Sequence, residues 1–304
     1  MNPRGCPRLM LVVLASAVLG HRDAEAEPRS QACEKGSTVS WRPHRPVPGS
    51  LFSLRIDRRA NGTRPEGSVA GERLHFSAGR DGVWRALAAA PIDSARSLAL
   101  RVTCADSPSD TVKRAISLAS MAYPLERLRV APEFSAAPDS ALAARLRKEA
   151  DRSRAVSVAS HDTPRLWEAP FSPPRASRIT SGFGRGREFN GTVTSRHMGT
   201  DYAGVVGAPV RAANRGVVRL VDRFFLGGNV IYIDHGEGLV TAYLHLSQQR
   251  AAERDTVERG DVIGLVGATG RVTGPHLHFI ARFGGVTVDP ASLMRVSAQA
   301  YPPP

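Results

Sequence analysis

The sequence predicts a predominantly all-β protein with a small N-terminal β domain, a helical connector and a C-terminal β domain. Residues 27–135 contain several short runs in which apolar side chains alternate with period two, the spacing of half-buried strands. Residues 175–295 repeat apolar β-runs that are broken by glycine, as in APVRAANRGVVRLVDR. A helical pattern stands out in one stretch only, ALAARLRKEADRSR. At 304 residues the chain exceeds one typical domain, so two domains are expected.

The N-terminus has the three parts of a secretory signal over residues 1–26. Arg4 and Arg8 precede an apolar run at residues 9–20, and Ala24 and Ala26 supply the small residues of a cleavage site. The run is shorter than the roughly 20 residues that span a bilayer. We therefore expect an exported protein of the periplasm or cell envelope, or a secreted one, with no transmembrane span after signal removal. A retained membrane anchor is the alternative.

Two cysteines, Cys33 and Cys104, follow the predicted signal. Neither has a cysteine or histidine neighbour at metal-ligand spacing. An even pair in an exported chain predicts a disulfide across the first domain.

Residues 27–135 are expected to form a β-sandwich-like domain. In GSLFSLRID, Phe52, Leu54 and Ile56 occupy every second position and so share one face of the expected strand. The segment GERLHFSAGRDGVWRALAAAP contains two apolar runs around an Arg-Asp-Gly turn. Its histidines, His44 and His75, are expected to stand alone as solvated or core residues. The domain contains no recognisable catalytic constellation.

The predicted connector and linker occupy residues 136–174. Asp139 or Ser140 can cap the helix, whose charged surface favours an exposed connector. Residues 156–174 are rich in serine and proline and read as a linker, either free or laid across a neighbouring groove. The C-terminal β domain covers residues 175–295, and residues 296–304 are expected to be a tail.

The formal net charge is +13 and the isoelectric point is near 10.8, with three lysines among 41 basic residues. Such a charge favours anionic partners, including the anionic polymers of a cell envelope, although arginine-rich coding would give the same composition. The 18 aromatic residues are scattered and no basic block contains them, so nucleic acid is not an expected partner. Nothing in the composition indicates an oligomeric state.

Three histidine patterns lie in the C-terminal third of the chain. His197 and Asp201 are four residues apart around Gly199, which allows the backbone to bend. His276 and His278 are two apart in a predicted strand, so their imidazoles point to the same face. His245 ends an alternating strand and is a polar residue that needs a partner or a purpose.

Imidazole and carboxylate are the ligands of a catalytic zinc site, which keeps three protein ligands and one open position. Two histidines and one aspartate from these patterns satisfy that count, and the spare imidazoles could move protons beside the metal. The alternative is a set of independent surface histidines with Asp201 as a turn residue. Spacing alone does not separate the ligands from the other imidazoles.

Four blocks in the same order resemble the lysostaphin/LytM-type zinc metalloendopeptidases, which cleave peptide cross-links of bacterial peptidoglycan. The blocks are RHMGTDYAG, GGNVIYIDHGEGLVTAYLHL, VERGDVIGLVGATGRVTGPHLHF and VDP, between residues 181 and 290. The resemblance implies a split β-barrel, the duplicated hybrid motif fold, with one zinc ion in an open groove. The N-terminal half resembles more loosely the accessory domains of envelope members of this family.

The resemblance also implies a role for each histidine. His197, Asp201 and His278 match the metal ligands, whereas His245 and His276 match the two active-site histidines that do not bind the metal. His235 is expected to be structural.

The expected function is therefore a secreted zinc endopeptidase that cleaves peptidoglycan cross-links, with a preference for D,D-bonds. A non-catalytic regulator and a zinc-stabilised wall-binding module on the same fold are the alternatives. Glu188 and Asn190 could block the open metal position in a latent form.

Overall fold

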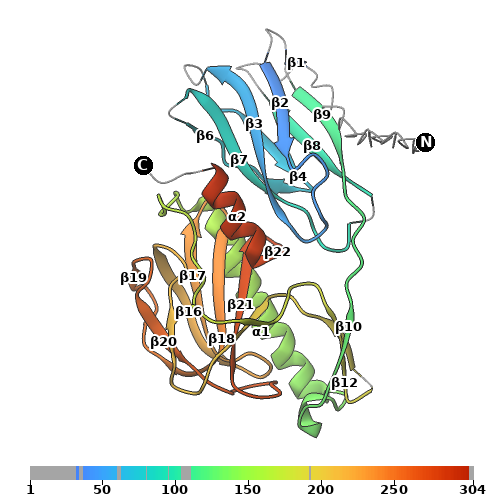
Figure 1. Ribbon diagram of the computed structural model, residues 1–304, viewed down its shortest axis with the longest axis vertical. Coiled ribbons are helices and arrows are strands. Elements are labelled where there is room, and N and C mark those ends of the chain that lie inside the picture. The colour runs from blue at the N-terminus through green and yellow to red at the C-terminus, as the bar shows by residue number, and fades with distance from the viewer. Residues whose placement is uncertain are drawn as a thin grey trace, which may run out of the picture.

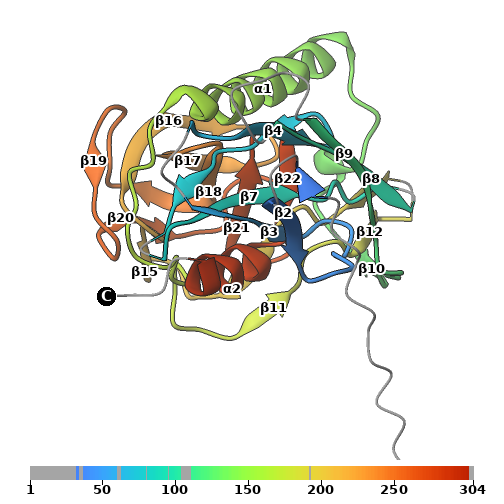
Figure 2. The same ribbon diagram turned by 90° about the horizontal axis from the view of Figure 1, so that it is seen from above.

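The computed structural model describes residues 32–33, 37–59, 63–79, 81–94, 96–103, 111–191 and 193–300. Strands dominate these residues, and two α-helices accompany them. The prediction of a predominantly all-β protein is confirmed. In Figure 1 an N-terminal pair of sheets lies above a larger sheet, and in the view from above, Figure 2, the two α-helices flank the strands on opposite sides.

The N-terminal region consists of two antiparallel sheets around one apolar core. The first sheet has the order β1 (Ala32–Cys33), β2 (Ser37–Arg42), β3 (Leu51–Arg59), β7 (Val83–Ala89) and β6 (Ser77–Ala78), and the second β5 (Glu72–Arg73), β4 (Glu66–Val69), β8 (Ser97–Thr103) and β9 (Thr111–Ser117). Phe52, Leu54 and Ile56 are fully buried between them, as their alternation predicts. Both predicted disulfide partners lie outside the part whose side chains are described.

The C-terminal region is built on one large, mainly antiparallel sheet. Its main path runs β11 (Ile179–Ser181), β14 (Thr200–Ala203), β21 (His276–Phe283), β18 (Leu239–Gln249), β17 (Gly228–Gly236), β16 (Gly216–Phe224) and β19 (Thr256–Val257), while β15 (Pro209–Arg211) pairs with β20 (Val262–Val266) and β22 (Val286–Val288) with β21. Strand β18 pairs with β17, β20 and β21, so it lies at the centre of this sheet.

A third, small sheet joins the two regions. Strand β10 (Leu125–Leu128) leaves the N-terminal sandwich and pairs in parallel with β12 (Gly186–Phe189), which forms a hairpin with β13 (Val193–Arg196). The sequence places β10 within the N-terminal domain, but its hydrogen-bond partner belongs to the C-terminal region. The predicted boundary at residue 135 therefore lies beyond a strand that is shared between the two regions.

Helix α2 (Pro290–Ala300) is an element that the sequence analysis missed, since it expected β structure to residue 295 and a tail after it. The Asp289 carboxylate accepts a hydrogen bond from the Ala291 amide at 3.0 Å, and Pro290 stands at the first helical position. Leu293 and Val296 are buried on one face. The Ser292 hydroxyl accepts the Leu51 amide at 2.8 Å, so α2 bridges the two regions.

Helix α1 (Ser140–Ala159) is confirmed, with Asp139 as its N-cap and the Leu142 amide as donor at 2.7 Å. Only Ser153 and Ser157 among its residues are buried. Small side chains let the helix approach the large sheet closely, along β16 and β17. The predicted connector therefore packs on the C-terminal region along its length (Figure 1).

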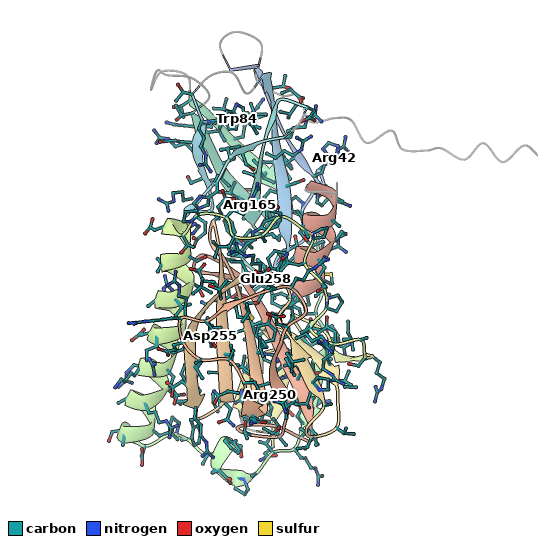
Figure 3. All side chains as sticks on the ribbon, turned by 90° about the vertical axis from the view of Figure 1, so that its left-hand side faces the viewer. Arg42, Trp84, Arg165, Arg250, Asp255 and Glu258 are labelled. Carbon is teal, nitrogen blue, oxygen red and sulfur yellow. The ribbon has the colours of Figure 1, made fainter. Side chains whose placement is uncertain are left out.

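The segment after α1 packs against the C-terminal region. A short 3₁₀ turn, η2 (Ser160–Asp162), follows α1, just as η1 (Pro132–Phe134) precedes it. Trp167 and Phe171 are buried in the core of the C-terminal region, which also contains Leu51 of β3. Figure 3 shows Arg165 at the junction between the sandwich, marked by Trp84, and the large sheet. The sequence left open whether residues 156–174 form a free linker or lie across a neighbouring groove. In the structure this segment packs against the C-terminal region.

Neither helix of the described part of the chain is both long and apolar enough to cross a membrane.

Candidate metal centre

Adjacent strands of the large sheet bring the predicted ligands together. Asp201 of β14 lies directly opposite His278 of β21 in the antiparallel register, so both side chains project from the same face. His197 comes from the turn between β13 and β14, and its side chain reaches the same point. Leu277 and Phe279 are fully buried on the other face of β21, as the alternation predicts.

The three side chains converge on one point. Asp201 Oδ1 lies 3.0 Å from His197 Nε2 and 2.7 Å from His278 Nδ1, and these two nitrogens are 3.0 Å apart. All three residues are buried, and one donor atom of each lies within 4.8 Å of the others. Among the described residues, this is the one group of three or more such donors that close together.

Hydrogen bonds outside the cluster orient the His197 ring. Its Nδ1–H donates to the Gly182 carbonyl at 2.8 Å, with the Ser181 hydroxyl at 3.1 Å, so the neutral ring presents the Nε2 lone pair to the cluster.

Gly199 is required by space. A Cβ at this position would lie 2.6 Å from both His278 Cε1 and the Phe279 carbonyl oxygen. The sequence suggested that this glycine allows a backbone bend, whereas in the structure the His278 ring approaches it too closely for a side chain.

The electrostatics favour an ionised Asp201 carboxylate beside a neutral His278. Burial acts to raise the pKa of Asp201, but its contacts with His197 and His278 outweigh that effect and hold the pKa well below its usual range. Burial lowers the pKa of His278 to about 4, against the opposing effect of Asp201. An ionised carboxylate and a neutral imidazole are the protonation states that a metal ion needs in such ligands.

Two further imidazoles border the cluster. His276 Nε2 lies 3.7 Å from Asp201 Oδ1, and His276 Nδ1–H donates to the Gly274 carbonyl at 2.8 Å. The His245 ring centroid is 5.0 Å from that of His276 and 5.8 Å from that of His278. The Nδ1–H of His245 donates to the Thr269 carbonyl at 2.8 Å. In the neutral form of each ring, Nε2 is therefore the nitrogen that carries the lone pair.

The backbone of His245 explains how this side chain reaches the site. Strict alternation along β18 would place His245 on the same face as Tyr243, which is fully buried in the core. His245 instead has a φ of +64°, in the left-handed region that non-glycine residues rarely adopt. This conformation interrupts the alternation, and it is the kind of backbone strain that gathers at functional sites.

Burial lowers the pKa of His245 well below its usual value, and the neighbouring charges of His278 and His276 act in the same direction. The ring is therefore neutral at physiological pH.

A network of residues that was not predicted from the sequence holds Asp201. Arg187 of β12 donates to Asp201 Oδ2 at 2.6 Å, which leaves Oδ1 facing the two imidazoles. Glu126 of β10 lies 3.5 Å from Arg187 Nε and accepts the Ser181 hydroxyl at 3.0 Å. No sequence signal marks Glu126, because a parallel pairing between segments 61 residues apart places it here.

Glu188 and Asn190 point away from the cluster, so neither blocks it. Asn190 Nδ2 donates to the Val130 carbonyl at 2.9 Å, and Glu188 pairs with Arg127 at 3.3 Å.

The other histidines of the described residues lie elsewhere. His235 is buried, with Nδ1–H donating to the Arg215 carbonyl at 2.7 Å and Nε2 2.8 Å from the Thr241 hydroxyl, in agreement with a structural role. The expectation that His75 stands alone is wrong, because its Nε2 lies 2.8 Å from His161 Nδ1.

A cavity of about 650 Å³ opens beside the cluster. Asp201 and His276 line it, as do residues of β10, β12 and the loop before β21. The donor set of two imidazole nitrogens and one carboxylate oxygen fits zinc, and the cavity leaves room for a substrate at the fourth position.

The β fold and the His-Asp-His donor set agree with what the resemblance to the zinc metallopeptidases implies. Residues 195–290 match the model of Peptidase family M23.

Curated relatives match mainly over the same region. The chain is 48% identical over 97 residues to the DD-carboxypeptidase/endopeptidase Mpg of Neisseria meningitidis. This match covers 32% of the present chain and 22% of Mpg. It is 37% identical over 131 residues to the peptidoglycan DD-endopeptidase ShyC of Vibrio cholerae. This match covers 42% of the present chain and 30% of ShyC. The chain thus spans less than a third of the length of these relatives.

One solved structure matches both regions. A Pseudomonas aeruginosa crystal structure described as a peptidase M23 superposes with a TM-score of 0.63, at 24% identity, over 82% of this chain and 94% of the other. This likeness supports the fold over the matched part of the chain, which includes residues of both regions.

Proposed function

We propose that this protein is a zinc-dependent endopeptidase that cleaves peptide cross-links of bacterial peptidoglycan, with D,D-bonds as its preferred substrate. The observation that carries the proposal is the convergence of His197, Asp201 and His278 on one point beside a cavity, within a domain of Peptidase family M23. The names of the relatives, a DD-carboxypeptidase/endopeptidase and a DD-endopeptidase, support the bond preference.

The three converging residues would hold the ion through His197 Nε2, Asp201 Oδ1 and His278 Nδ1. Zinc, when bound, supplies a Lewis acid that polarises a carbonyl and lowers the pKa of water towards about 7. Arg187 keeps Asp201 Oδ2 occupied, so the carboxylate offers one oxygen to the ion.

The other two histidines would move the protons. In the neutral state His245 and His276 each present an Nε2 lone pair, so either ring accepts a proton from the attacking water before it can donate one. The water oxygen forms a bond to the scissile carbonyl carbon, the carbon–nitrogen bond breaks, and the transferred proton leaves on the amine. The ring that is not the base would take up a proton from solvent at Nε2, and this N–H would then stabilise the oxyanion.

Export to the periplasm or envelope, over a signal at residues 1–26, is part of the proposal because peptidoglycan lies outside the cytoplasm. The domain limits at residues 27–135, 136–174 and 175–295 also stay predictions. The positive charge of the chain would favour anionic envelope polymers as further contacts.

The test is digestion of purified peptidoglycan by the full chain, with and without a chelator and with zinc added back. We expect cross-linked muropeptide dimers to fall and monomers to rise in the zinc-loaded sample alone. If a folded, zinc-loaded chain released no monomers, the proposal of an enzyme would be wrong. That result would support a non-catalytic regulator or a wall-binding module instead.

A further inference from the structure

We propose that Arg271 binds a free carboxylate of the peptide beside the metal-site residues, so that stem peptides carrying such a carboxylate are the preferred substrates. The inference rests on the proposed function and names a substrate-recognition residue within it.

The Arg271 side chain is held in place within the cavity wall. Its guanidinium carbon lies 4.0 Å from the centre of the Phe189 ring, a stacked arrangement in which the ring face supports the guanidinium plane. Its backbone amide donates to the Leu226 carbonyl at 2.9 Å, which anchors the loop before β21. Arg271, Asp201 and His276 line the same cavity.

The charges of the cavity do not balance around Arg271. Five charged residues and His276 line the cavity, the charged ones being Glu126, Asp201, Arg178, Arg187 and Arg271. Both carboxylates pair with Arg187, at 3.5 and 2.6 Å. Among the described residues, no carboxylate lies within ion-pair distance of Arg271.

Burial, and secondarily the charge of Arg187, lowers the pKa of Arg271, as expected for a guanidinium without a counter-charge. A half-buried cation of this kind is stabilised when an anion binds beside it. The stacked face is occupied by Phe189, but the N–H edge of the fork stays available to an acceptor.

The chemistry of the substrate supplies such an acceptor. A peptide chain ends in an α-carboxylate, and a diaminopimelate residue carries a second one near the cross-link. A guanidinium fork matches a carboxylate with two parallel hydrogen bonds, which add geometric selectivity to charge. Arg178 is exposed at the rim of the same cavity and adds positive charge without a defined contact.

The experiment compares two cross-linked stem-peptide dimers, one with free carboxylates and one with the same carboxylates converted to carboxamides. The full zinc-loaded chain is assayed as wild type, Arg271→Gln, Arg271→Lys and Arg250→Gln. Arg250 is an exposed arginine of the same region, labelled in Figure 3, outside the cavity lining, and serves as the matched control.

We expect Arg271→Gln to lower kcat/KM for the free-carboxylate dimer by about 10- to 100-fold, mainly through KM, and to change the amidated dimer by less than about threefold. Arg271→Lys should retain part of the discrimination, because it keeps the charge and loses the fork. Arg250→Gln should match wild type. Equal losses on both dimers, or no loss on either, would overturn the role of Arg271.

Binding to the zinc-loaded chain, measured by calorimetry, separates this inference from the proposed function. If wild type cleaves neither dimer, the proposed function fails, yet tighter binding of the free-carboxylate dimer that disappears in Arg271→Gln would still support the carboxylate site. Equal affinity for both dimers would contradict it. Melting curves of each variant exclude loss of the fold as the cause.

Discussion

Two clusters of imidazole and carboxylate groups occupy different regions of this molecule, and their geometries differ. At the metal site, His197, Asp201 and His278 point their donor atoms at one location. At the junction of the two regions, His75, His161 and Glu72 form a line in which His75 Nε2 lies 2.8 Å from His161 Nδ1 and His161 Nε2–H donates to Glu72 at 3.0 Å.

Each cluster consists of two imidazoles and one carboxylate, so the kind of functional group does not distinguish them. In the line, each imidazole nitrogen of His161 is used by a neighbour, and Glu72 also accepts the Gly285 amide at 3.1 Å. No position remains where three lone pairs meet. The convergent cluster can bind a cation, whereas the linear cluster joins the sandwich to the C-terminal region.

The largest expected effect breaks the convergent cluster. His278→Ala should lose bound zinc and peptidoglycan cleavage together, to the uncatalysed background, because two ligands do not complete the site. Metal content after gel filtration and muropeptide analysis measure the two losses. His161→Ala is the matched control from the linear cluster and should keep its zinc; loss of metal in this variant as well would remove the distinction between the clusters.

A smaller effect separates ligands from proton carriers. His245→Ala and His276→Ala should each lower kcat by about 10²- to 10⁴-fold while most zinc is retained, since these rings act on protons beside the ion. Cleavage rates and a zinc competition titration give the two numbers. If either variant loses zinc as fully as His278→Ala, the assignment of that ring is wrong.

The outer residues of the metal site should affect affinity rather than chemistry. Glu126→Gln and Arg187→Lys are expected to weaken zinc binding by about 10- to 100-fold, because both residues fix the orientation of Asp201. The Co²⁺-substituted chain should show an altered visible absorption spectrum. Glu188→Gln, on the neighbouring strand position with its own partner Arg127, is the control and should bind zinc like wild type.

The linear cluster should influence stability and its pH dependence. Burial lowers the pKa of His75 from 6.5 to about 4, with His161 adding to the effect. Between pH 6.5 and 4 the unfolded chain therefore binds a proton that the folded chain does not, so this contribution to stability is lost as pH falls through that window. The hydrogen bond between Glu72 and His161 lowers the pKa of Glu72, against the opposing effect of burial. The contribution of Glu72 to stability is therefore lost as the pH falls below 4.5.

His75→Gln tests this pH dependence. It should lower the free energy of unfolding at pH 7 by about 0.5–1.5 kcal/mol through the lost hydrogen bond. It should also flatten the decline of Tm between pH 6.5 and 4. An unchanged slope would show that His75 does not titrate in this way, and cleavage at pH 7 should stay near wild type.

Local patterns in the sequence were sufficient for much of the site. Because side chains two apart share a face of a strand, His276 and His278 had to lie together with Leu277 and Phe279 behind them, and the structure agrees. Resemblance to a known family then supplied the prediction of which imidazole binds the ion, a distinction that spacing does not contain. The Asp139 cap was also predictable, since it needs only the next three residues.

Other features depended on contacts between distant segments. Glu126 reaches Arg187 only through the parallel pairing of β10 with β12, and His75 meets His161 only where the sandwich packs on the C-terminal region. Helix α2 was hidden because its apolar face is short and its burial is against β3.

The sequence by itself determined the strands, the alternation that aims His276 and His278, and the donor types of a metal site, because these depend on neighbouring residues. Tertiary structure alone decided that His245 leaves the core face through a left-handed φ and that Arg271 lacks a carboxylate partner among the described residues. The physical reason is that backbone strain and unbalanced charge are properties of a packed environment, which surrounding segments impose and no local pattern encodes.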